Sequence, residues 1–442
     1  MNMPSPSSFY EVKGLPILGS LLPITRDALQ LFTRVLQQHG DRVYMRVPGR
    51  EILLLCHPQD IEQVLVRDSQ AYGRSAEILK LRSIFGRGLL ASDGDLWRRQ
   101  RALIQPSFQP NALAKYCSTM LATIRAQVSA WRDGDTLDIH AEMLKYTRNT
   151  ICRILFGEEV AAARSDLADA VTTIFGELRS EVLYLPMWRR LPTQRSRKWY
   201  RAVRILNAAI RGIILERRQT GGHDHDLLGS LIKARDSQGM VMSDQQIHDE
   251  ILTFFLAGHE TTALALTWAF YLLASHGDHQ KLLREEAQSR LGRADDRAED
   301  YAQLRLVGAA LKETLRLYPP VWSTGRKVAV DTTLGGRSLA RGLDIWICLH
   351  RLHRDPRWYA DPNRFDPARW SEHPKQPFTY LPFGLGARVC IGRNFATAES
   401  VLGLAAVLSE FRVELASKEE VKPSAWITLR PSRPIHLRIT RA

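Results

Sequence analysis

One stretch of the chain constrains the fold more than any other. Residues 251–274, ILTFFLAGHETTALALTWAFYLLA, are almost wholly apolar, and an apolar stretch of this length could span a bilayer as a helix. However, the polar sequence HETT, which begins at His259, lies at its middle, and an ionisable residue at mid-bilayer costs several kcal/mol. The pattern therefore predicts a helix that runs through the core of a large domain.

The N-terminal sequence MNMPSPSSFYEVKGLPILGSLLPI does not predict a membrane anchor. Its apolar part is only about a dozen residues long, too short to span a bilayer, and Pro16 and Gly19 interrupt it. We therefore expect no transmembrane anchor.

The composition is that of an ordinary globular protein, 45% hydrophobic and 24% charged over 442 residues. We find no linker, repeat or low-complexity tract, and so expect a single domain over 1–442. The net charge is +14 but includes no run of like charges, which favours a basic protein without nucleic-acid binding. An odd number of cysteines, five, and no secretory signal indicate a reducing compartment, and we expect a cytoplasmic protein.

Hydrophobic periodicity predicts a mainly α fold with small β-sheets. Helical patterns dominate from about 95 to 290, whereas strand-like runs occur near both ends of the chain. Two prolines within 183–198 predict a loop between two helices. The other expected elements are strands at 42–47, 51–56, within 321–349 and at the C-terminus, and helices at 304–317 and about 391–411.

The most informative motif is PFGLGARVCIGRNFA, residues 382–396. Its glycines allow tight turns and close backbone approach to a flat, bulky ligand. Cys390 lies just before a predicted helix, whose free N–H groups can stabilise the thiolate, the form that binds metals. Phe383 can shield the sulfur from water, and Arg388 can reach an anionic group. A buried free cysteine is the alternative, but the combined pattern of Phe383, Gly386, Arg388, Cys390 and Gly392 is far more restrictive.

This pattern, F-x-x-G-x-R-x-C-x-G, resembles the haem-binding signature of the cytochromes P450, the haem-thiolate monooxygenases, and the resemblance extends from GLPILGSLLP to WITLRP. It implies the cytochrome P450 fold with a long central helix over the haem, and Cys390 as the axial iron ligand. Thiolate ligation favours O–O bond cleavage. The implied cofactor is haem b, with electrons that come ultimately from NAD(P)H through redox partners. The branch resembled is the fatty-acid-hydroxylating and microsomal one, in a soluble, bacterial-type form.

AGHETT, residues 257–262, resembles the family motif A-G-x-[DE]-T-[TS]. The resemblance makes Glu260 and Thr261 the acid–alcohol pair for oxygen activation and assigns Gly258 to leave room for dioxygen. A buried carboxylate beside a hydroxyl can relay protons, and such polar atoms can open a helix into a π-bulge. From these residues alone, a threonine bonded to its own helix and a glutamate paired in the core are equally good readings.

KETLR, residues 312–316, places Glu313 and Arg316 on one helical face. An exposed ion pair of little energetic value is one interpretation. The resemblance instead implies the family's buried E-x-x-R pair, completed by Arg364 of PNRF and holding the cysteine loop in place. Asn363 stands where the family more often has Glu.

Three weaker motifs complete the candidate site. WRRQR, residues 97–101, resembles the family's W-x-x-x-R on a helix beside the haem, although a basic helix is more commonly a solvated face. Trp97 and Arg101 lie one helical turn apart, so the resemblance implies that both face a propionate. Arg326 of STGRKV matches the usual position of another propionate partner, and HRDPRW, residues 353–358, matches the family for structural reasons. HDHD, ending at Asp226, lacks the ligand spacing of a metal site, and we expect Asp226 to cap a helix.

The resulting prediction is an oxidoreductase of secondary metabolism that inserts one oxygen atom of O2 into a lipophilic small molecule, typically by hydroxylation. A fatty acid, a terpenoid and a polyketide all remain possible substrates, and the branch resemblance favours the first two. The alternatives are a haem-thiolate peroxygenase or isomerase, which would need no acid–alcohol pair, and a non-catalytic haem-binding sensor. The expected pocket residues are Ile84, Phe85, Phe175, Leu183, Phe254, Phe255, Val321 and Trp322.

The sequence carries no attached flavin or iron–sulfur domain, so electrons are expected from separate proteins. An acidic ferredoxin or flavodoxin, with its reductase, could dock on basic residues. The candidates for this surface are Arg98, Arg99, Arg388 and Arg393. We expect the chain itself to act as a monomer.

Overall fold

The computed structural model describes residues 9–14, 18–158, 160, 170, 173–174, 193–220, 226–291, 298–371 and 376–442. These residues form two compact units, each built from separate stretches of the chain. Unit 1 draws on 1–79, 309–393 and 419–433, and unit 2 on 80–308, 394–418 and 434–442. The single domain expected from the sequence stays a prediction.

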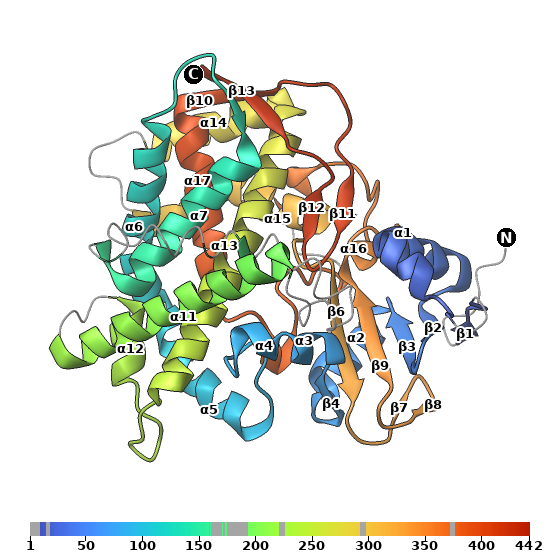
Figure 1. Cartoon of the computed structure of the whole chain (residues 1–442). Helices are drawn as coiled ribbons and strands as arrows, with labels where there is room; N and C mark the ends of the chain where they lie inside the picture. Colours follow the sequence, from blue (N-terminus) through green and yellow to red (C-terminus); the bar gives the residue numbers. More distant parts are fainter. Residues whose placement is uncertain are drawn as a thin grey trace. The chain divides into compact units, whose positions relative to one another are not determined.

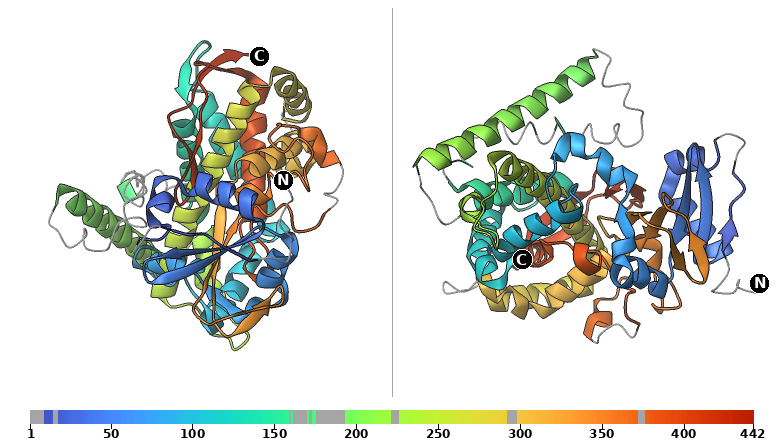
Figure 2. Two further views of the ribbon diagram at one scale, coloured as in Figure 1. Left: turned by 90° about the vertical axis from the view of Figure 1, so that its right-hand side faces the viewer. Right: turned by 90° about the horizontal axis from the view of Figure 1, so that it is seen from below.

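A six-stranded mixed sheet organises unit 1. Its strands are β1 (Tyr10–Glu11), β2 (Arg42–Val47), β3 (Arg50–Leu55), β4 (Tyr72–Arg74), β6 (Ser323–Val328) and β9 (Asp344–Cys348), in the order β1-β2-β3-β9-β6-β4. β1 pairs parallel with β2, and β3 with β9; the other neighbours are antiparallel. N-terminal strands thus lie beside strands from the last third of the chain (Figures 1 and 2).

Helix α1 (Leu21–His39) covers part of this sheet. Its buried residues, among them Phe32, Val35 and Leu36, recur at helical spacing and belong to the same apolar core as Leu53 and Ile345 of β3 and β9. The amphipathic pattern of α1 therefore supplies the core of unit 1. The other elements of unit 1 are α2 (Pro58–Glu62), a π-helical turn (Gln63–Arg67), α3 (Ala76–Lys80), the hairpins β7 (Thr332–Leu334) with β8 (Arg337–Leu339) and β11 (Pro423–Ala425) with β12 (Leu429–Pro431), and α16 (Leu349–Leu352).

Unit 2 is mainly helical. Its elements are α4 (Arg82–Phe85), α5 (Gly94–Ile104), α6 (Pro110–Val128), α7 (Ile139–Phe156), α11 (Gln194–Thr220), α12 (Leu227–Lys233), α13 (Asp244–Ala274), α14 (Gly277–Leu291), α17 (Arg393–Glu410) and the sheet β10 (Phe411–Leu415), β13 (His436–Arg441) and β5 (Thr136–Asp138). α15 (Arg305–Leu317) leads from unit 2 into unit 1.

The long helix α13 forms the centre of unit 2. A capping box starts it: Ser243 Oγ accepts the Gln246 N–H (3.3 Å), while the Gln246 side chain accepts the Ser243 N–H (3.0 Å). Nearly every side chain that follows is buried, and α7 packs along α13 (Figure 1). This confirms the predicted core helix, which begins seven residues before the apolar run. Among the described residues, no helix is long and apolar enough to cross a membrane.

Two local predictions can be compared with the structure. Asp226 caps α12 as expected, because its carboxylate accepts the Gly229 N–H at 2.8 Å. The predicted loop 183–198 was wrong at its end: α11 begins at Gln194, and the helical spacing that buries Trp199 extends back to that residue. Residues 183–192 lie outside the described residues.

Candidate active site

The loop before Cys390 is built by its own backbone. The Cys390 N–H donates to the Phe383 carbonyl (2.9 Å), and the Val389 N–H donates to the Gly386 carbonyl (3.0 Å). These bonds close a compact turn that ends at the cysteine, and α17 begins three residues later at Arg393. The sequence PFGLGARVCIG therefore fixes the backbone around the sulfur locally.

Gly386 has a structural reason to be glycine. Its φ is +73°, and a Cβ added there would lie 2.0 Å from the carbonyl oxygen of Leu65. Leu65 belongs to the π-helical turn after α2. Since no other residue permits both this conformation and this approach, Gly386 fixes the loop against that turn.

Cys390 also differs from the other cysteines in exposure. All five lie in the described part of the chain; Cys390 is exposed, while Cys56, Cys117, Cys152 and Cys348 are buried. Burial raises the pKa of Cys152 and of Cys348 to about 12, so both remain neutral thiols. Cys390 is therefore the sulfur that an iron-containing cofactor could reach.

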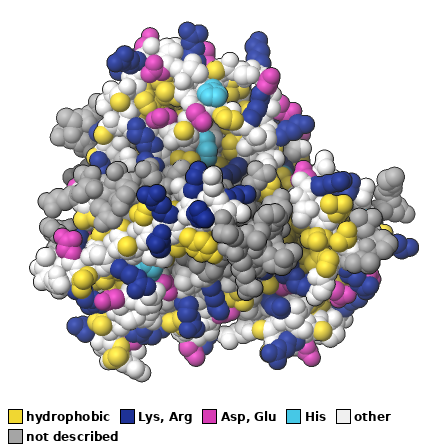
Figure 3. Space-filling view, in the orientation of Figure 1, with side chains coloured by type: hydrophobic (Ala, Val, Ile, Leu, Met, Phe, Trp, Pro, Cys, Tyr) yellow, Lys and Arg dark blue, Asp and Glu magenta, His cyan; other side chains and the backbone are white. Residues whose placement is uncertain are grey.

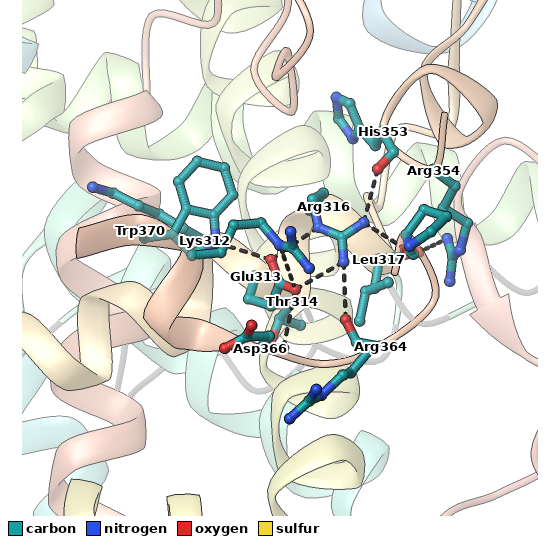
Figure 4. Close-up of polar contacts among 12 residues, drawn as sticks. Lys312, Glu313, Thr314, Arg316, Leu317, His353, Arg354, Arg364, Asp366 and Trp370 are labelled. Atoms are coloured by element: carbon teal, nitrogen blue, oxygen red, sulfur yellow. Dashed lines mark hydrogen bonds and ion pairs between the residues drawn. The ribbon is translucent and has the colours of Figure 1, made fainter. Parts of the chain in front are cut away.

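A buried ion pair supports the cysteine loop from behind. Glu313 and Arg316 of α15 are both fully buried and form a bidentate pair, with N–O distances of 2.9 and 2.8 Å. Arg316 also donates to the His353 carbonyl (2.8 Å), and the His353 ring accepts the Leu381 N–H (2.9 Å). Leu381 in turn accepts the Gly384 N–H at the start of the loop. The pair is thus structural, as the resemblance implied (Figure 4).

The third arginine of this network was predicted wrongly. Arg364 contributes its main-chain carbonyl, which accepts from Arg316 at 3.1 Å, and its exposed side chain points away from Glu313 (Figure 4). Arg369, five residues later, places its Nε 3.4 Å from Glu313, and the Trp370 indole N–H donates to Glu313 at 2.9 Å. The tertiary fold selected the second of two nearby arginines.

His353 holds this network in one protonation state. The ring is fully buried, and burial, followed by the charges of Arg316 and Arg354, lowers its pKa to about 3. The ring is therefore neutral at physiological pH, and its Nε2 can accept the Leu381 N–H. HRDPRW is thus structural here, as expected.

Unit 1 offers a site for anionic groups at Arg326. Arg74 of β4 lies directly opposite Arg326 of β6, so both side chains project from the same face of the sheet. Like charges at directly opposite positions are destabilising, and Arg326 is only 9% exposed. Two guanidinium groups on one face of a sheet could also bind carboxylates, so this donor set would fit the propionates of a haem. No sequence pattern pointed to Arg74, because only strand register pairs it with Arg326.

Helix α5 in unit 2 carries two further predicted residues. Asp93 caps it by accepting the Gly94 N–H at 3.0 Å. Trp97 and Arg101 are half-buried and one turn apart, while Gln100 and Leu103 between and beyond them are buried. Both predicted side chains therefore share the more open side of α5, a placement that fits donors to a carboxylate.

The AGHETT segment of α13 has one partly open strip. Ala257, Gly258 and Thr261 are half-buried in a helix whose other central residues are buried, and their spacing puts them on one face. Glu260 is 3% exposed. The helix is continuous here, and the Thr261 hydroxyl donates to the Ala257 carbonyl at 2.9 Å. The suggested π-bulge is therefore absent from this described helix, and the alternative, a threonine bonded to its own helix, is what the structure shows.

The predicted pocket residues divide into three groups. Phe255 is fully buried between Phe156 and His259 in the core of unit 2, and Trp322 packs on Phe32 in the core of unit 1. Phe85 and Phe254 are buried, whereas Val321 is exposed. Phe175, Leu183 and the side chain of Ile84 lie outside the described residues.

One other cluster has metal-ligand chemistry. Ligand atoms of Asp41, Cys56 and Asp355 lie within 4.8 Å of one another. However, Arg357 donates to both carboxylates, at 2.7 and 2.6 Å, and desolvation raises the pKa of Cys56 well above its ordinary value. This cluster is therefore an ion-pair network of unit 1.

Comparison with known proteins agrees with this geometry. The family model described as Cytochrome P450 matches residues 11–438. Cyclooctatin synthase of Streptomyces melanosporofaciens is 35% identical over 424 residues, which cover 94% of this chain and 92% of that protein. Pentalenene oxygenase of Streptomyces avermitilis is 33% identical over 432 residues, 96% of each chain.

A solved structure shows the same fold. The crystal structure of the cytochrome P450DA heme domain aligns with a TM-score of 0.89 over 98% of each chain, at 24% sequence identity. The family match, the relatives and the cysteine loop agree. The chain belongs to the cytochrome P450 family and is an oxidoreductase of the monooxygenase type.

Proposed function

We propose that this monooxygenase inserts one oxygen atom of O2 into a terpenoid, with haem b bound through the Cys390 thiolate. The observation that carries the proposal is the cysteine loop: an exposed cysteine in a glycine-rich turn, supported from behind by a fully buried ion pair. When bound, a haem with a thiolate ligand supplies O–O bond cleavage and C–H oxidation. The protein supplies the ligand, protons and a shaped apolar site.

Each predicted residue has a stated role in the proposal. Cys390 holds the iron, with Phe383 and Gly392 on either side of it in the loop. Arg326 binds a propionate from unit 1, as does its strand neighbour Arg74. The remaining residues that we propose for cofactor binding are Trp97, Arg101, Gly258 and Arg388.

Glu260 and Thr261 would move protons toward the oxygen that a bound haem would activate. The Thr261 hydroxyl lies on the half-open strip of α13 and donates to the Ala257 carbonyl. Its oxygen can still accept a hydrogen bond, and can therefore hold a proton donor at the place of oxygen reduction. The buried Glu260 carboxyl then resupplies the proton. The helix keeps Gly258 one turn before Thr262, whose hydroxyl donates to the Gly258 carbonyl at 3.0 Å.

The relatives favour a terpenoid over the other lipophilic classes. One is named for oxygenation of pentalenene, and another, from Streptomyces melanosporofaciens, for 5-monooxygenation of cyclooctat-9-en-7-ol at 33% identity. An apolar substrate agrees with the apolar residues Phe85 and Phe254 in unit 2. Catalysis would serve secondary metabolism.

Electrons would come from NAD(P)H through an acidic ferredoxin or flavodoxin and its reductase. Arg393 is exposed just after the cysteine loop, and Arg98 is exposed on α5. Two of the candidates already pair with carboxylates, Arg99 with Asp236 at 2.6 Å and Arg98 with Asp95. Figure 3 shows one face of the molecule, on which Lys and Arg side chains are spread among hydrophobic and acidic ones. Complementary charge mainly raises the association rate, which salt lowers.

The central test is spectroscopic. Reduced protein under carbon monoxide should show the red-shifted Soret band of thiolate ligation; C390H should lose it, and the control C152A, which changes a buried thiol, should keep it. A C390H protein with the parent spectrum would contradict the proposal. A binding screen with terpenoids, fatty acids and polyketides on the oxidised protein without carbon monoxide, read by the Soret shift that follows displacement of water from the iron, then ranks the substrate classes. Tighter binding of fatty acids would refute the terpenoid assignment.

The redox-partner proposal has its own test. The rate of reduction by an acidic ferredoxin should fall as ionic strength rises, and R393Q should lower it at low salt. Rates without salt dependence would contradict an electrostatic docking surface.

A further inference from the structure

The segment between α4 and α5 is fastened to α13 by two adjacent carboxylates. Asp249 Oδ2 accepts the Arg87 N–H at 2.8 Å, and Glu250 Oε2 accepts the Leu89 N–H at 2.9 Å. We call these two carboxylates, with the two amides that they bind, the carboxylate clamp. All four residues belong to unit 2.

The segment lies against α13 without room for side chains. A Cβ on Gly88 would lie 2.2 Å from Thr253 Oγ1 and 2.5 Å from the Asp249 carbonyl oxygen. Gly86, with φ of +58°, would place a Cβ 2.3 Å from the Asp249 carboxyl. The two glycines thus allow the backbone to approach closely enough for both carboxylates to reach its amides.

The clamp connects two parts of the candidate active site. Gln100 of α5 donates to the Arg87 carbonyl at 3.0 Å, so the clamped segment is tied to α5 as well as to α13. α5 carries Trp97 and Arg101, and α13 carries Glu260 ten residues after Glu250. Holding the segment therefore fixes the placement of α5 relative to α13.

The two carboxylates differ in their surroundings. Hydrogen bonds from His248, Arg87 and Gln245 outweigh desolvation and lower the pKa of Asp249. Glu250 is fully buried, and its Oε1 has no hydrogen-bond partner among the described atoms. Desolvation, followed by the charge of Asp249, raises the pKa of Glu250 to about 8.

The charged groups that face Glu250 explain why burial dominates. On α13 its neighbours are Asp249 and His248, which bind each other at 3.2 Å. The packed segment presents main-chain amides to Glu250, while the Arg82 and Arg87 side chains are exposed. No cation among the described residues therefore compensates an ionised Glu250.

We propose that Asp249 and Glu250 are positioning residues that clamp the 86–89 segment between α5 and α13, and that Glu250 makes the clamp weaken as pH rises from mildly acidic to neutral. The clamp itself is a property of the protein fold. Only its consequence for catalysis, the alignment of α5 with α13, rests on the proposed function.

The sign follows from proton linkage. When the segment detaches, Glu250 meets water and ionises at its ordinary pKa, so the detached state binds fewer protons than the clamped state below pH 8. Rising pH therefore favours detachment, by about tenfold per pH unit between pH 6 and 7. Above pH 8 the effect levels off, because Glu250 is then ionised in both states.

Hydrogen exchange of the Leu89 amide tests the clamp directly. The loaded, full-length protein is studied at pH 6, 7 and 8, with exchange corrected for the intrinsic pH dependence of amides. We expect wild-type protection at 86–92 to fall about tenfold from pH 6 to 7. E250Q, the neutral counterpart of the protonated side chain, should keep the pH 6 protection at every pH, whereas the exposed-site control E285Q should follow wild type.

Two further variants separate the clamp from a simple burial effect. E250L removes the acceptor and should lower protection at all three pH values, and D249N should lower it at Arg87. Equal pH slopes in wild type and E250Q, or a flat wild-type slope, would overturn the proposal.

A catalytic readout tests the consequence separately. If the clamp aligns α5 with α13, E250L should raise the dissociation constant of a substrate whose binding shifts the Soret band. The carbon monoxide band of the same variant should stay unchanged. A normal pH dependence of exchange in a protein without thiolate ligation would refute the proposed function while the clamp stands. Normal thiolate ligation in a protein whose exchange shows no pH dependence would refute the clamp alone.

Discussion

Replacing the buried Glu313, whose ion pair supports the cysteine loop, should lower the free energy of unfolding more than the same substitution at an exposed glutamate. The perturbation is E313Q. Glu313 and Arg316 are both fully buried, so the substitution leaves the Arg316 guanidinium charged in the interior without its counterion. Breaking such a pair from one side costs about 3–5 kcal/mol.

The contacts of Glu313 support the upper part of that range. Its oxygens accept from Arg316 twice, from the Trp370 indole (2.9 Å) and from the Asp366 N–H (3.1 Å), with Arg369 at 3.4 Å. A glutamine keeps one oxygen but turns an NH2 group toward these donors. Because each unsatisfied buried group costs about 1–3 kcal/mol, the amide replaces the carboxylate poorly.

Guanidinium unfolding curves measure the loss, and E51Q provides the control. Glu51 pairs with Arg46 at 3.1 Å, but both side chains are more than half exposed, so its removal should cost about 0–1 kcal/mol. The double variant E313Q/R316M should recover only part of the loss, because Arg316 also donates to the His353 carbonyl and to two other carbonyls.

The same variants test whether the pair holds the cysteine loop. E313Q should lose the thiolate carbon monoxide band at a lower denaturant concentration than its helical circular dichroism, since the network reaches Leu381 through His353. A loss of stability below about 1 kcal/mol, as for E51Q, would refute the reasoning about burial.

Three other predictions follow from single residues. G386A should destabilise the cysteine loop by at least about 1–3 kcal/mol, because its Cβ would meet the Leu65 carbonyl. The control G384A, with a φ of +74° but no atom within 4 Å of its Cβ, should cost less. The melting temperatures of the two loaded variants compare them, and equal losses would contradict the steric argument. The pKa of His353 is lowered to about 3, so the unfolded state binds a proton between pH 6.5 and 3 that the folded state does not. The free energy of unfolding should therefore fall with falling pH by up to about 1.4 kcal/mol per unit. Unfolding curves at pH 5, 6 and 7 should show a shallower slope for H353Q, and identical slopes would contradict the role of His353. E260Q should lower product formation about a hundredfold while the carbon monoxide band is unchanged, and unaltered turnover would remove Glu260 from the proton path.

Local patterns gave correct predictions where the backbone decides the outcome. The glycines of the cysteine loop, the cap at Asp226 and the apolar run of α13 each specify their conformation within a few residues. The sequence could show that Gly386 was glycine, but not that the Leu65 carbonyl lies against it, because Leu65 is more than three hundred positions away.

Patterns were insufficient wherever two similar residues competed or two distant segments met. Arg364 and Arg369 lie in one short segment, and only its path across α15 turns Arg369 toward Glu313. Arg74 became a candidate through its register opposite Arg326. Asp249 and Glu250 look like the polar start of a helix in the sequence, and become a clamp only because the 86–89 segment packs on them.

By itself, the sequence determined the family and the core helix, because glycine placement and apolar periodicity act through the chain's own backbone. It also predicted Cys390 as the iron ligand and Glu260 with Thr261 as the acid–alcohol pair. Only the tertiary structure decided which arginine completes the Glu313 network, which cations lie together and which carboxylates are deprived of water. The physical reason is that burial and strand register depend on segments far apart in the chain, and both change the energy of a charge more than any local pattern does.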